Sequence, residues 1–254
     1  MLTITSPELD AWLAAFMFPF FRFAALVQTA PVFSHASVPR RLRLGLALLL
    51  TILIAPTLPP VAAGSPFSAP GLVLILEQIA IGFAIGLVMQ LAFAAVTLAG
   101  DLIGLQMGLS FASLMDPQHS EQVPLVGAFL SVVLTLAFLA LNGHLMMISA
   151  LVHTFDAFPV RADALARLDW QRLAQGAAIV FSTGLAIALP AVAALLITSL
   201  ALGVLTRTAP QLNLFAVGFP LTLGIGLLML FLAMPYTLPA MDQLVGAVLQ
   251  LLPR

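Results

Sequence analysis

Residues 173–206 read LAQGAAIVFSTGLAIALPAVAALLITSLALGVLT, a continuous run of 34 residues in which no side chain is charged. One proline, Pro190, lies near the middle of this run. An α-helix needs about 20 apolar residues to cross the ~30 Å hydrocarbon core of a bilayer. The run is therefore long enough to supply one membrane-spanning helix with residues to spare.

Similar apolar segments occupy most of the remaining chain. They cover residues 11–33, 44–76, 78–100, 122–155 and 208–241, and only the first of them contains a charged side chain, Arg22. Polar or proline- and glycine-rich stretches separate these segments, as expected for connections between helices. The sequence therefore predicts about six apolar helical segments.

Prolines fall inside these segments or at their ends. They are Pro19, Pro31, Pro56, Pro190, Pro220 and Pro235. A proline within a helix removes one backbone hydrogen bond, and lipid cannot satisfy the carbonyl that is left. Two interpretations stay open, namely ordinary kinks of membrane helices, or helices broken into hairpins within a larger assembly.

The composition indicates which solvent surrounds the protein. Hydrophobic residues make up 62% of the 254 residues and charged residues only 7%, with a mean hydropathy of +1.15. A soluble domain carries roughly 25% charged residues, because its surface must be hydrated. We therefore predict an all-α integral membrane protein that is surrounded by lipid and by other apolar protein.

Several functional classes are disfavoured by what the sequence contains. The net charge of −1 offers no basic patch for nucleic acid. Cysteine is absent and the four histidines are scattered, so no metal-ligand spacing stands out. Motifs for nucleophilic catalysis or phosphate binding are also missing. We expect neither enzyme activity nor a cofactor or metal site.

Two ionisable residues, Arg22 and Glu77, are set deepest in apolar sequence. A charge in the middle of a membrane span costs at least ~2.5 kcal/mol on insertion scales, so such a residue suggests a function. One interpretation places both residues near helix ends, where they reach interfacial water or a partner subunit. The other makes them charge partners in a secondary transporter.

Small residues recur every four positions in the middle of the chain. Gly82 and Gly86 form one such pair, and Gly100, Gly104 and Gly108 continue the spacing. Glycines at this spacing leave a groove in which a second backbone can approach closely. These positions predict a helix-packing face.

Residues 106–117, QMGLSFASLMDP, lead from an apolar helix into a polar segment that ends in proline. Met107, Phe111 and Met115 recur at helical spacing, and methionine adapts to irregular surfaces. From the residues alone, the three side chains form either a buried core stripe or a soft seal across a conduit.

Four separated stretches carry a resemblance to a known family. They are APVFS at 30–34 followed by VPRR at 38–41; residues 106–117; NGHL at 142–145 with Thr154-Phe155; and LTRTAPQLN at 205–213 followed by GFPL at 218–221. Together they cover nearly the whole chain in one order. The chain resembles the FliR family, whose members are subunits of the flagellar type III protein export gate.

The resemblance implies a single membrane-embedded export-gate domain over residues 1–254. Members of the family assemble with FliP-like and FliQ-like subunits into a closed hetero-oligomeric spiral of helical hairpins, and an FlhB-like subunit docks from the cytoplasmic side. The expected location is the bacterial inner membrane at the flagellar basal body, raised toward the periplasm. The expected cargo is unfolded exported protein.

The resemblance also implies a channel plug at residues 108–122. Phe111 and Met115 become the expected occluding side chains, while Met107, Gly108, Asp116 and Pro117 bound or anchor the loop. Two alternatives remain, a subunit of a virulence type III secretion system and a stand-alone secondary transporter.

Overall fold

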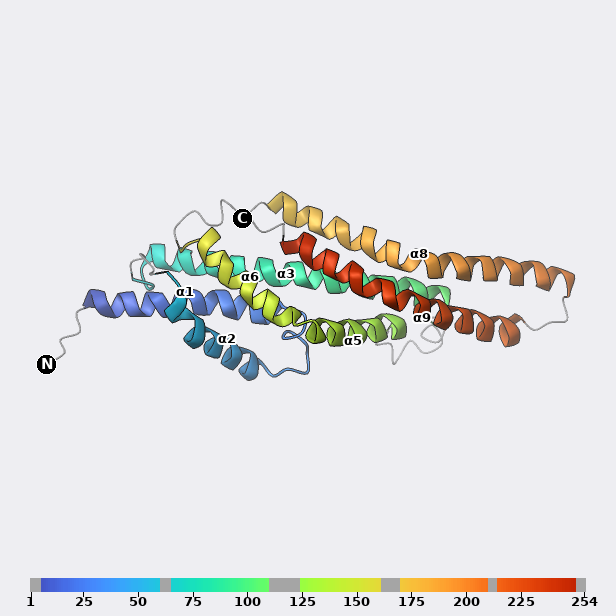
Figure 1. Ribbon diagram of the computed structural model, residues 1–254, viewed down its shortest axis with the longest axis horizontal. Helices are drawn as coiled ribbons and strands as arrows, with labels where there is room; N and C mark the ends of the chain where they lie inside the picture. Colours follow the sequence, from blue (N-terminus) through green and yellow to red (C-terminus); the bar gives the residue numbers. More distant parts are fainter. Residues whose placement is uncertain (1–5, 60–64, 110–123, 161–169, 210–213, 250–254) are drawn as a thin grey trace. The chain divides into compact units, whose positions relative to one another are not determined.

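The computed structural model describes residues 6–59, 65–109, 124–160, 170–209 and 214–249. Within these ranges the chain forms seven α-helices and one 3-10 turn, and no strand (Figure 1). The elements are α1 (Ser6–Thr29), α2 (Arg40–Ile54), η1 (Ala55–Thr57), α3 (Ala69–Gln106), α5 (Leu125–Ala140), α6 (Gly143–Ala157), α8 (Trp170–Thr208) and α9 (Leu214–Leu249).

Four described helices, α1, α3, α8 and α9, are long and apolar enough to cross a membrane. The number rises to five if α5 and α6, which meet at an angle of 67°, form one broken span. The prediction of an all-α membrane protein is confirmed. The expected segment at 44–76 differs, because it divides into the short helix α2, the turn η1 and the beginning of α3.

Acidic side chains do not mark helix ends as the sequence had suggested. Glu77 was expected to separate two apolar segments, and Asp101 to begin a polar stretch. Both lie inside α3, which continues without interruption from Ala69 to Gln106. A single carboxyl group leaves the backbone hydrogen bonds of a helix intact, whereas the helix ends where glycine permits a left-handed turn.

Prolines precede some helices and lie inside others, whereas one sharp bend is made at an asparagine. Pro39 immediately precedes α2, and Pro124 precedes α5, positions at which a missing backbone N–H is harmless. Helices α1 and α8 continue through Pro19 and Pro190. The sharp bend between α5 and α6 contains no proline and is made at Asn142, whose φ of 57° is left-handed.

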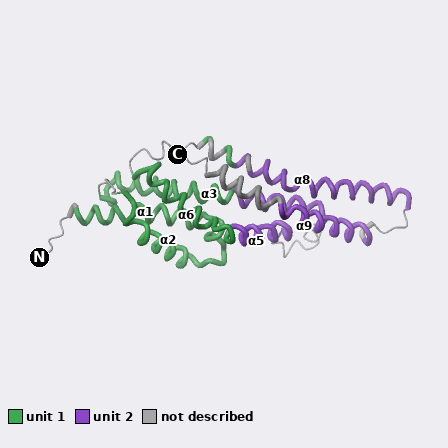
Figure 2. The backbone as a smooth tube through the Cα atoms, viewed as in Figure 1, with its two compact units in different colours: residues 1–91, 139–176, 246–254 green, residues 92–138, 177–245 purple. Residues whose placement is uncertain are grey.

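Contacts divide the chain into two compact units (Figure 2). Unit 1 comprises residues 1–91, 139–176 and 246–254, and unit 2 comprises residues 92–138 and 177–245. The boundaries fall inside α3, α5, α8 and α9, so they do not coincide with linkers. One membrane-embedded domain over residues 1–254 stays a prediction.

In unit 1, α1 packs on the first part of α3 through apolar side chains and two glycines. Ala14 and Phe18 of α1 form a buried cluster with Leu74 and Ile75 of α3. At Gly82 an added Cβ would collide with the carbonyl oxygen of Arg22, and at Gly86 it would collide with the side chain of Thr29. The two helices are therefore close enough to require glycine at both positions.

In unit 2, the second part of α3 packs against α5 and α8. A Cβ at Gly100 would lie 2.6 Å from the Cα of Gly127 in α5, and one at Gly184 of α8 would lie 2.8 Å from the Ala95 carbonyl oxygen. Phe93 and Phe138 meet edge to face at 5.8 Å between ring centroids. Gly104 is different, because a Cβ there would make only ordinary contact with Val126, at 3.4 Å.

Arg22 forms the polar centre of unit 1 and is fully buried. Its Nε donates to Gln78 Oε1 of α3 at 2.8 Å, and its Nη1 donates to Thr154 Oγ1 of α6 at 3.1 Å. Its Nη2 donates to the Phe158 carbonyl oxygen at 3.0 Å, and the guanidinium carbon lies 3.9 Å from the centroid of the Phe155 ring. One side chain of α1 therefore fixes both α3 and α6.

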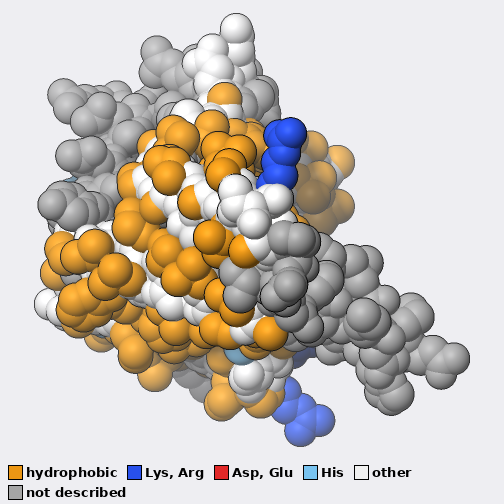
Figure 3. Space-filling model, turned by 90° about the vertical axis from the view of Figure 1, so that its right-hand side faces the viewer, with side chains coloured by type: hydrophobic (Ala, Val, Ile, Leu, Met, Phe, Trp, Pro, Cys, Tyr) orange, Lys and Arg blue, Asp and Glu red, His pale blue; other side chains and the backbone are white. Residues whose placement is uncertain are grey.

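Large apolar side chains remain exposed on α8 and α9. Phe181, Ile197, Leu200 and Phe231 are each between 68% and 73% exposed. Hydrophobic side chains also predominate on the face shown in Figure 3. Water would not tolerate so large an apolar area, so these faces are available to lipid or to other subunits.

Replacing Arg22 by leucine should destabilise unit 1 strongly. Three buried acceptors lose a donor. Thr154 Oγ1 keeps its own hydrogen bond to the Leu151 carbonyl oxygen, whereas Gln78 Oε1 and the Phe158 carbonyl oxygen lose the donors that now satisfy them. At ~1–3 kcal/mol for each of the last two acceptors, we expect a loss on the order of 2–6 kcal/mol. The stability of Arg22→Lys should lie between that of wild type and that of Arg22→Leu. Lysine keeps the charge, but one ammonium group cannot reproduce the planar fork of donors.

The measurement is the temperature at which half of the detergent-solubilised chain is no longer monodisperse. Arg207→Leu is the matched control, because Arg207 is an exposed arginine near the end of α8. Equal midpoints for Arg22→Leu and Arg207→Leu would contradict the structural role of the Arg22 network.

Candidate functional site: an apolar pocket at the end of α3

The end of α3 is fixed by a glycine turn. The N–H of Leu109 donates to the Gly104 carbonyl oxygen at 3.1 Å, and the N–H of Gly108 donates to the Leu105 carbonyl oxygen at 3.1 Å. Gly108 has a φ of 83°, which other residues adopt at a cost. This pair of bonds is the Schellman arrangement of helix ends, so the sequence sets the direction in which the chain leaves α3.

Met107, directly before this turn, is held by α9. Its side chain is 1% exposed and lies over Gly226, where an added Cβ would come within 2.6 Å of the Met107 sulfur. The hydroxyl of Thr222, one turn earlier in α9, donates to the Met107 carbonyl oxygen at 3.3 Å. Both the side chain and the backbone of Met107 are therefore attached to α9.

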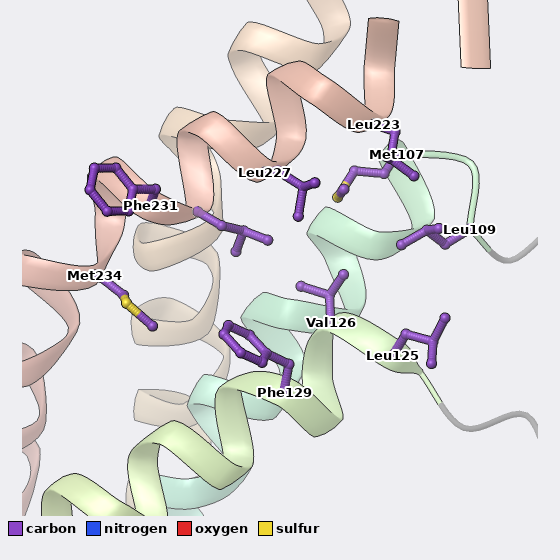
Figure 4. Close-up of a pocket in the computed structure, with 10 residues that line it drawn as sticks. Met107, Leu109, Leu125, Val126, Phe129, Leu223, Leu227, Phe231 and Met234 are labelled. Atoms are coloured by element: carbon purple, nitrogen blue, oxygen red, sulfur yellow. The ribbon is translucent and has the colours of Figure 1, made fainter. Parts of the chain in front are cut away.

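An apolar pocket lies beside Met107, with a cavity volume of about 340 Å³ (Figure 4). Its walls come from the end of α3, the beginning of α5 and the middle of α9. The lining residues are Met107, Leu109, Leu125, Val126, Phe129, Leu223, Leu227, Leu230, Phe231 and Met234. Every described side chain that lines the pocket is apolar, so these side chains offer van der Waals contact and no hydrogen bond.

Residues on either side of positions 110–123, which hold most of the predicted plug, line this pocket. Leu109, the second residue of the predicted plug, and Leu125, three residues after its end, both line the cavity. Phe111, Met115, Asp116 and Pro117 lie outside the described residues. Leu109 and Leu125 therefore mark where the described chain leaves α3 and where it enters α5.

The remaining predicted residues are placed as follows. Arg22 and Glu77 belong to unit 1 and are buried, with exposed fractions of 0% and 4%, so neither lines the pocket of unit 2. Gly82 and Gly86 face α1 in unit 1, and Gly100 faces α5 in unit 2.

Sequence reasoning missed the side of the pocket that α9 provides. Leu223, Gly226 and Leu227 lie more than 100 positions from Met107, and nothing in their spacing pairs them with it. Asp101 was also missed as a carboxyl group inside the long helix α3. It packs against Gly127 of α5, where an added Cβ would collide with its Oδ1 atom. Its position between Gly100 and Gly104 was a usable signal.

Within the ranges that the structure describes, no three or more histidine, aspartate or glutamate side chains gather as a metal would require. The arrangement is suited to close apolar packing, because the adaptable side chain of Met107 lines a cavity whose other described side chains are apolar.

Comparisons with known proteins agree with this picture of an apolar membrane component. A family model described as bacterial export proteins, family 1, matches residues 13–248. A flagellar biosynthetic protein FliR from Escherichia coli (strain K12) is 44% identical over 253 residues, which cover 99% of this chain and 96% of that relative.

Two further relatives carry the same name. The protein from Pectobacterium carotovorum subsp. carotovorum is 43% identical over 252 residues, covering 99% of this chain and 96% of its own. The protein from Bacillus subtilis (strain 168) is 33% identical over 226 residues, covering 87% and 86% respectively. The chain therefore belongs to family 1 of the bacterial export proteins, together with the flagellar biosynthetic proteins FliR.

Proposed function

We propose that this chain is a core subunit of the flagellar type III protein export gate and helps to plug its channel. The observation that carries the proposal is the apolar pocket whose lining includes both Leu109, at the start of the predicted plug, and Leu125, just after its end. The flagellar names of the relatives support the biological setting. Unfolded exported proteins are the proposed cargo.

The proposed seal works by excluding water. An ion that enters a narrow apolar constriction loses hydration without gaining new ligands, so the closed constriction does not conduct. Phe111 and Met115 are the proposed occluding side chains, and Met107 with Gly108 forms the fixed base from which the loop begins. Asp116 and Pro117 are proposed to end the occluding part of the loop.

The proposed partners are FliP-like, FliQ-like and FlhB-like subunits in a hetero-oligomeric spiral of helical hairpins. The exposed apolar faces of α8 and α9 support this proposal, because a helix that is apolar on its outer face needs lipid or protein to cover it. The proposed location is the bacterial inner membrane at the flagellar basal body, with part of the assembly raised toward the periplasm.

The same geometry would serve a virulence type III secretion gate, and the flagellar relatives are the reason to prefer the flagellar system. Membership of a bacterial export family gives no support to a stand-alone transporter. In unit 1 the guanidinium of Arg22 has hydrogen bonds to an amide, a hydroxyl and a backbone carbonyl, which is an arrangement typical of structural anchoring. The relatives are named for flagellar biosynthesis and not for an enzyme activity.

Removing the proposed occluding side chains should make the closed gate leak. We expect Phe111→Gly combined with Met115→Gly to raise the conductance of small ions through the reconstituted gate by at least about tenfold, because dehydration no longer opposes entry. Phe67→Gly is the control, since Phe67 is 67% exposed and lies outside the segment. Conductance would be measured in planar bilayers.

An assembled double variant that conducts no more than wild type would rule out the proposed plug. Assembly is checked separately by size-exclusion chromatography. A normal elution profile with unchanged conductance counts against the seal alone and leaves membership of the gate intact.

The base of the plug can be tested from α9 with a closely matched pair. Gly226→Leu should displace the Met107 side chain and raise the leak severalfold, because the new side chain occupies the space of the methionine. Gly224→Leu should leave conductance near wild type, since a Cβ at Gly224 meets no atom within 4 Å. Equal conductance for the two variants would show that the contact between Met107 and α9 does not position the plug.

A further inference from the structure

Helix α2 begins with the most basic turn in the described chain, Arg40-Arg41-Leu42-Arg43. Arg43 is held in place, because its Nη2 donates to the His35 carbonyl oxygen at 2.7 Å and its Nη1 donates to Gln28 Oε1 at 3.3 Å. Arg40 and Arg41 are exposed, and within the described ranges neither guanidinium has a hydrogen bond or an ion pair. Two cationic groups therefore face outward beside a fixed third one.

This placement of charge opposes the local electrostatics of the helix. The N-terminus of a helix carries a partial positive charge, which favours acidic side chains and disfavours arginine. The first turn of α2 contains no acidic residue, and its N-cap, Pro39, provides no side-chain hydrogen bond. Since the arginines do not stabilise α2 itself, an anion outside the described chain would account for them.

The rest of α2 presents an apolar face outward. Ala47, Leu50 and Thr51 are buried against the rest of unit 1, whereas Leu49, Ile52 and Leu53 are 60%, 58% and 68% exposed. From Leu44 to Ile54 the helix carries no charge and rises about 16 Å, close to half of a ~30 Å hydrocarbon core. The charged side chains thus lie at the beginning of α2 and the exposed apolar side chains lie further along it, whereas an ordinary amphipathic helix has them on opposite faces.

We propose that α2 enters one leaflet of the membrane and that Arg40 and Arg41 bind the phosphate groups of anionic phospholipids. The separation along the axis matches the layers of a bilayer, in which phosphates lie above acyl chains. Guanidinium groups form paired hydrogen bonds with phosphate oxygens, and basic residues at a membrane surface favour anionic lipid. The proposal rests on α2 alone and does not depend on the plug.

The test uses the full-length chain in bilayer discs that contain equal amounts of phosphatidylglycerol and phosphatidylethanolamine. Native mass spectrometry of the released protein gives the ratio of anionic to zwitterionic lipid that remains bound. Wild type should retain phosphatidylglycerol preferentially. Arg40→Gln and Arg41→Gln should each lower that ratio about fivefold, which corresponds to about 1 kcal/mol.

Two controls define the result. Arg207→Gln should leave the ratio unchanged, because this exposed arginine stands in the last turn of α8, where the negative end of the helix repels anions. Arg40→Lys with Arg41→Lys should retain most of the preference, since the charge is kept. The thermal midpoint of each variant shows that the exposed substitutions leave the fold intact.

The proposal is overturned if the Arg40→Gln and Arg41→Gln variants keep the wild-type lipid ratio. If the variants, co-expressed with gate subunits in a separate preparation, also lose a subunit, the arginines bind protein carboxylates instead of lipid.

Discussion

The burial of one guanidinium group, that of Arg22, constrains how the helices of unit 1 pack. Removing a charge from water costs several kcal/mol unless its hydrogen bonds are replaced. Arg22 replaces them with acceptors from α3 and from the end of α6, and with the ring of Phe155. The last carbonyls of a helix carry partial negative charge, so Phe158 is a favourable partner for a cation. Because the guanidinium fork is planar, these contacts fix α1, α3 and α6 in one register.

Helix α3 connects this constraint to the candidate site. Gly82 and Gly86 let α1 approach it closely enough for Arg22 to reach Gln78, and Gly100 lets α5 approach its later part. The helix then ends at the left-handed turn of Gly108, beside the apolar pocket. Glycine therefore acts twice in α3, first by allowing close packing and then by setting the direction of the chain at the base of the proposed plug.

The sequence predicted the features that depend on local composition and spacing. Long uncharged runs predicted the all-α membrane fold, and glycines four residues apart drew attention to the positions where α3 meets α1 and α5. Helix boundaries were predicted less well, because a charge at Glu77 or Asp101 does not interrupt a helix, whereas Asn142 bends the chain without a proline. The α9 wall of the pocket could not be predicted, since contact between Met107 and Gly226 depends on tertiary packing over more than 100 residues.

We propose that this chain functions within a hetero-oligomeric export gate, an assembly that native mass spectrometry can detect as a single species. The full-length chain would be co-expressed with FliP-like and FliQ-like subunits and extracted in mild detergent. We expect one hetero-oligomer that contains this chain, because the apolar faces of α8 and α9 then find protein partners. Recovery of the chain alone, or only with copies of itself, would contradict the claim.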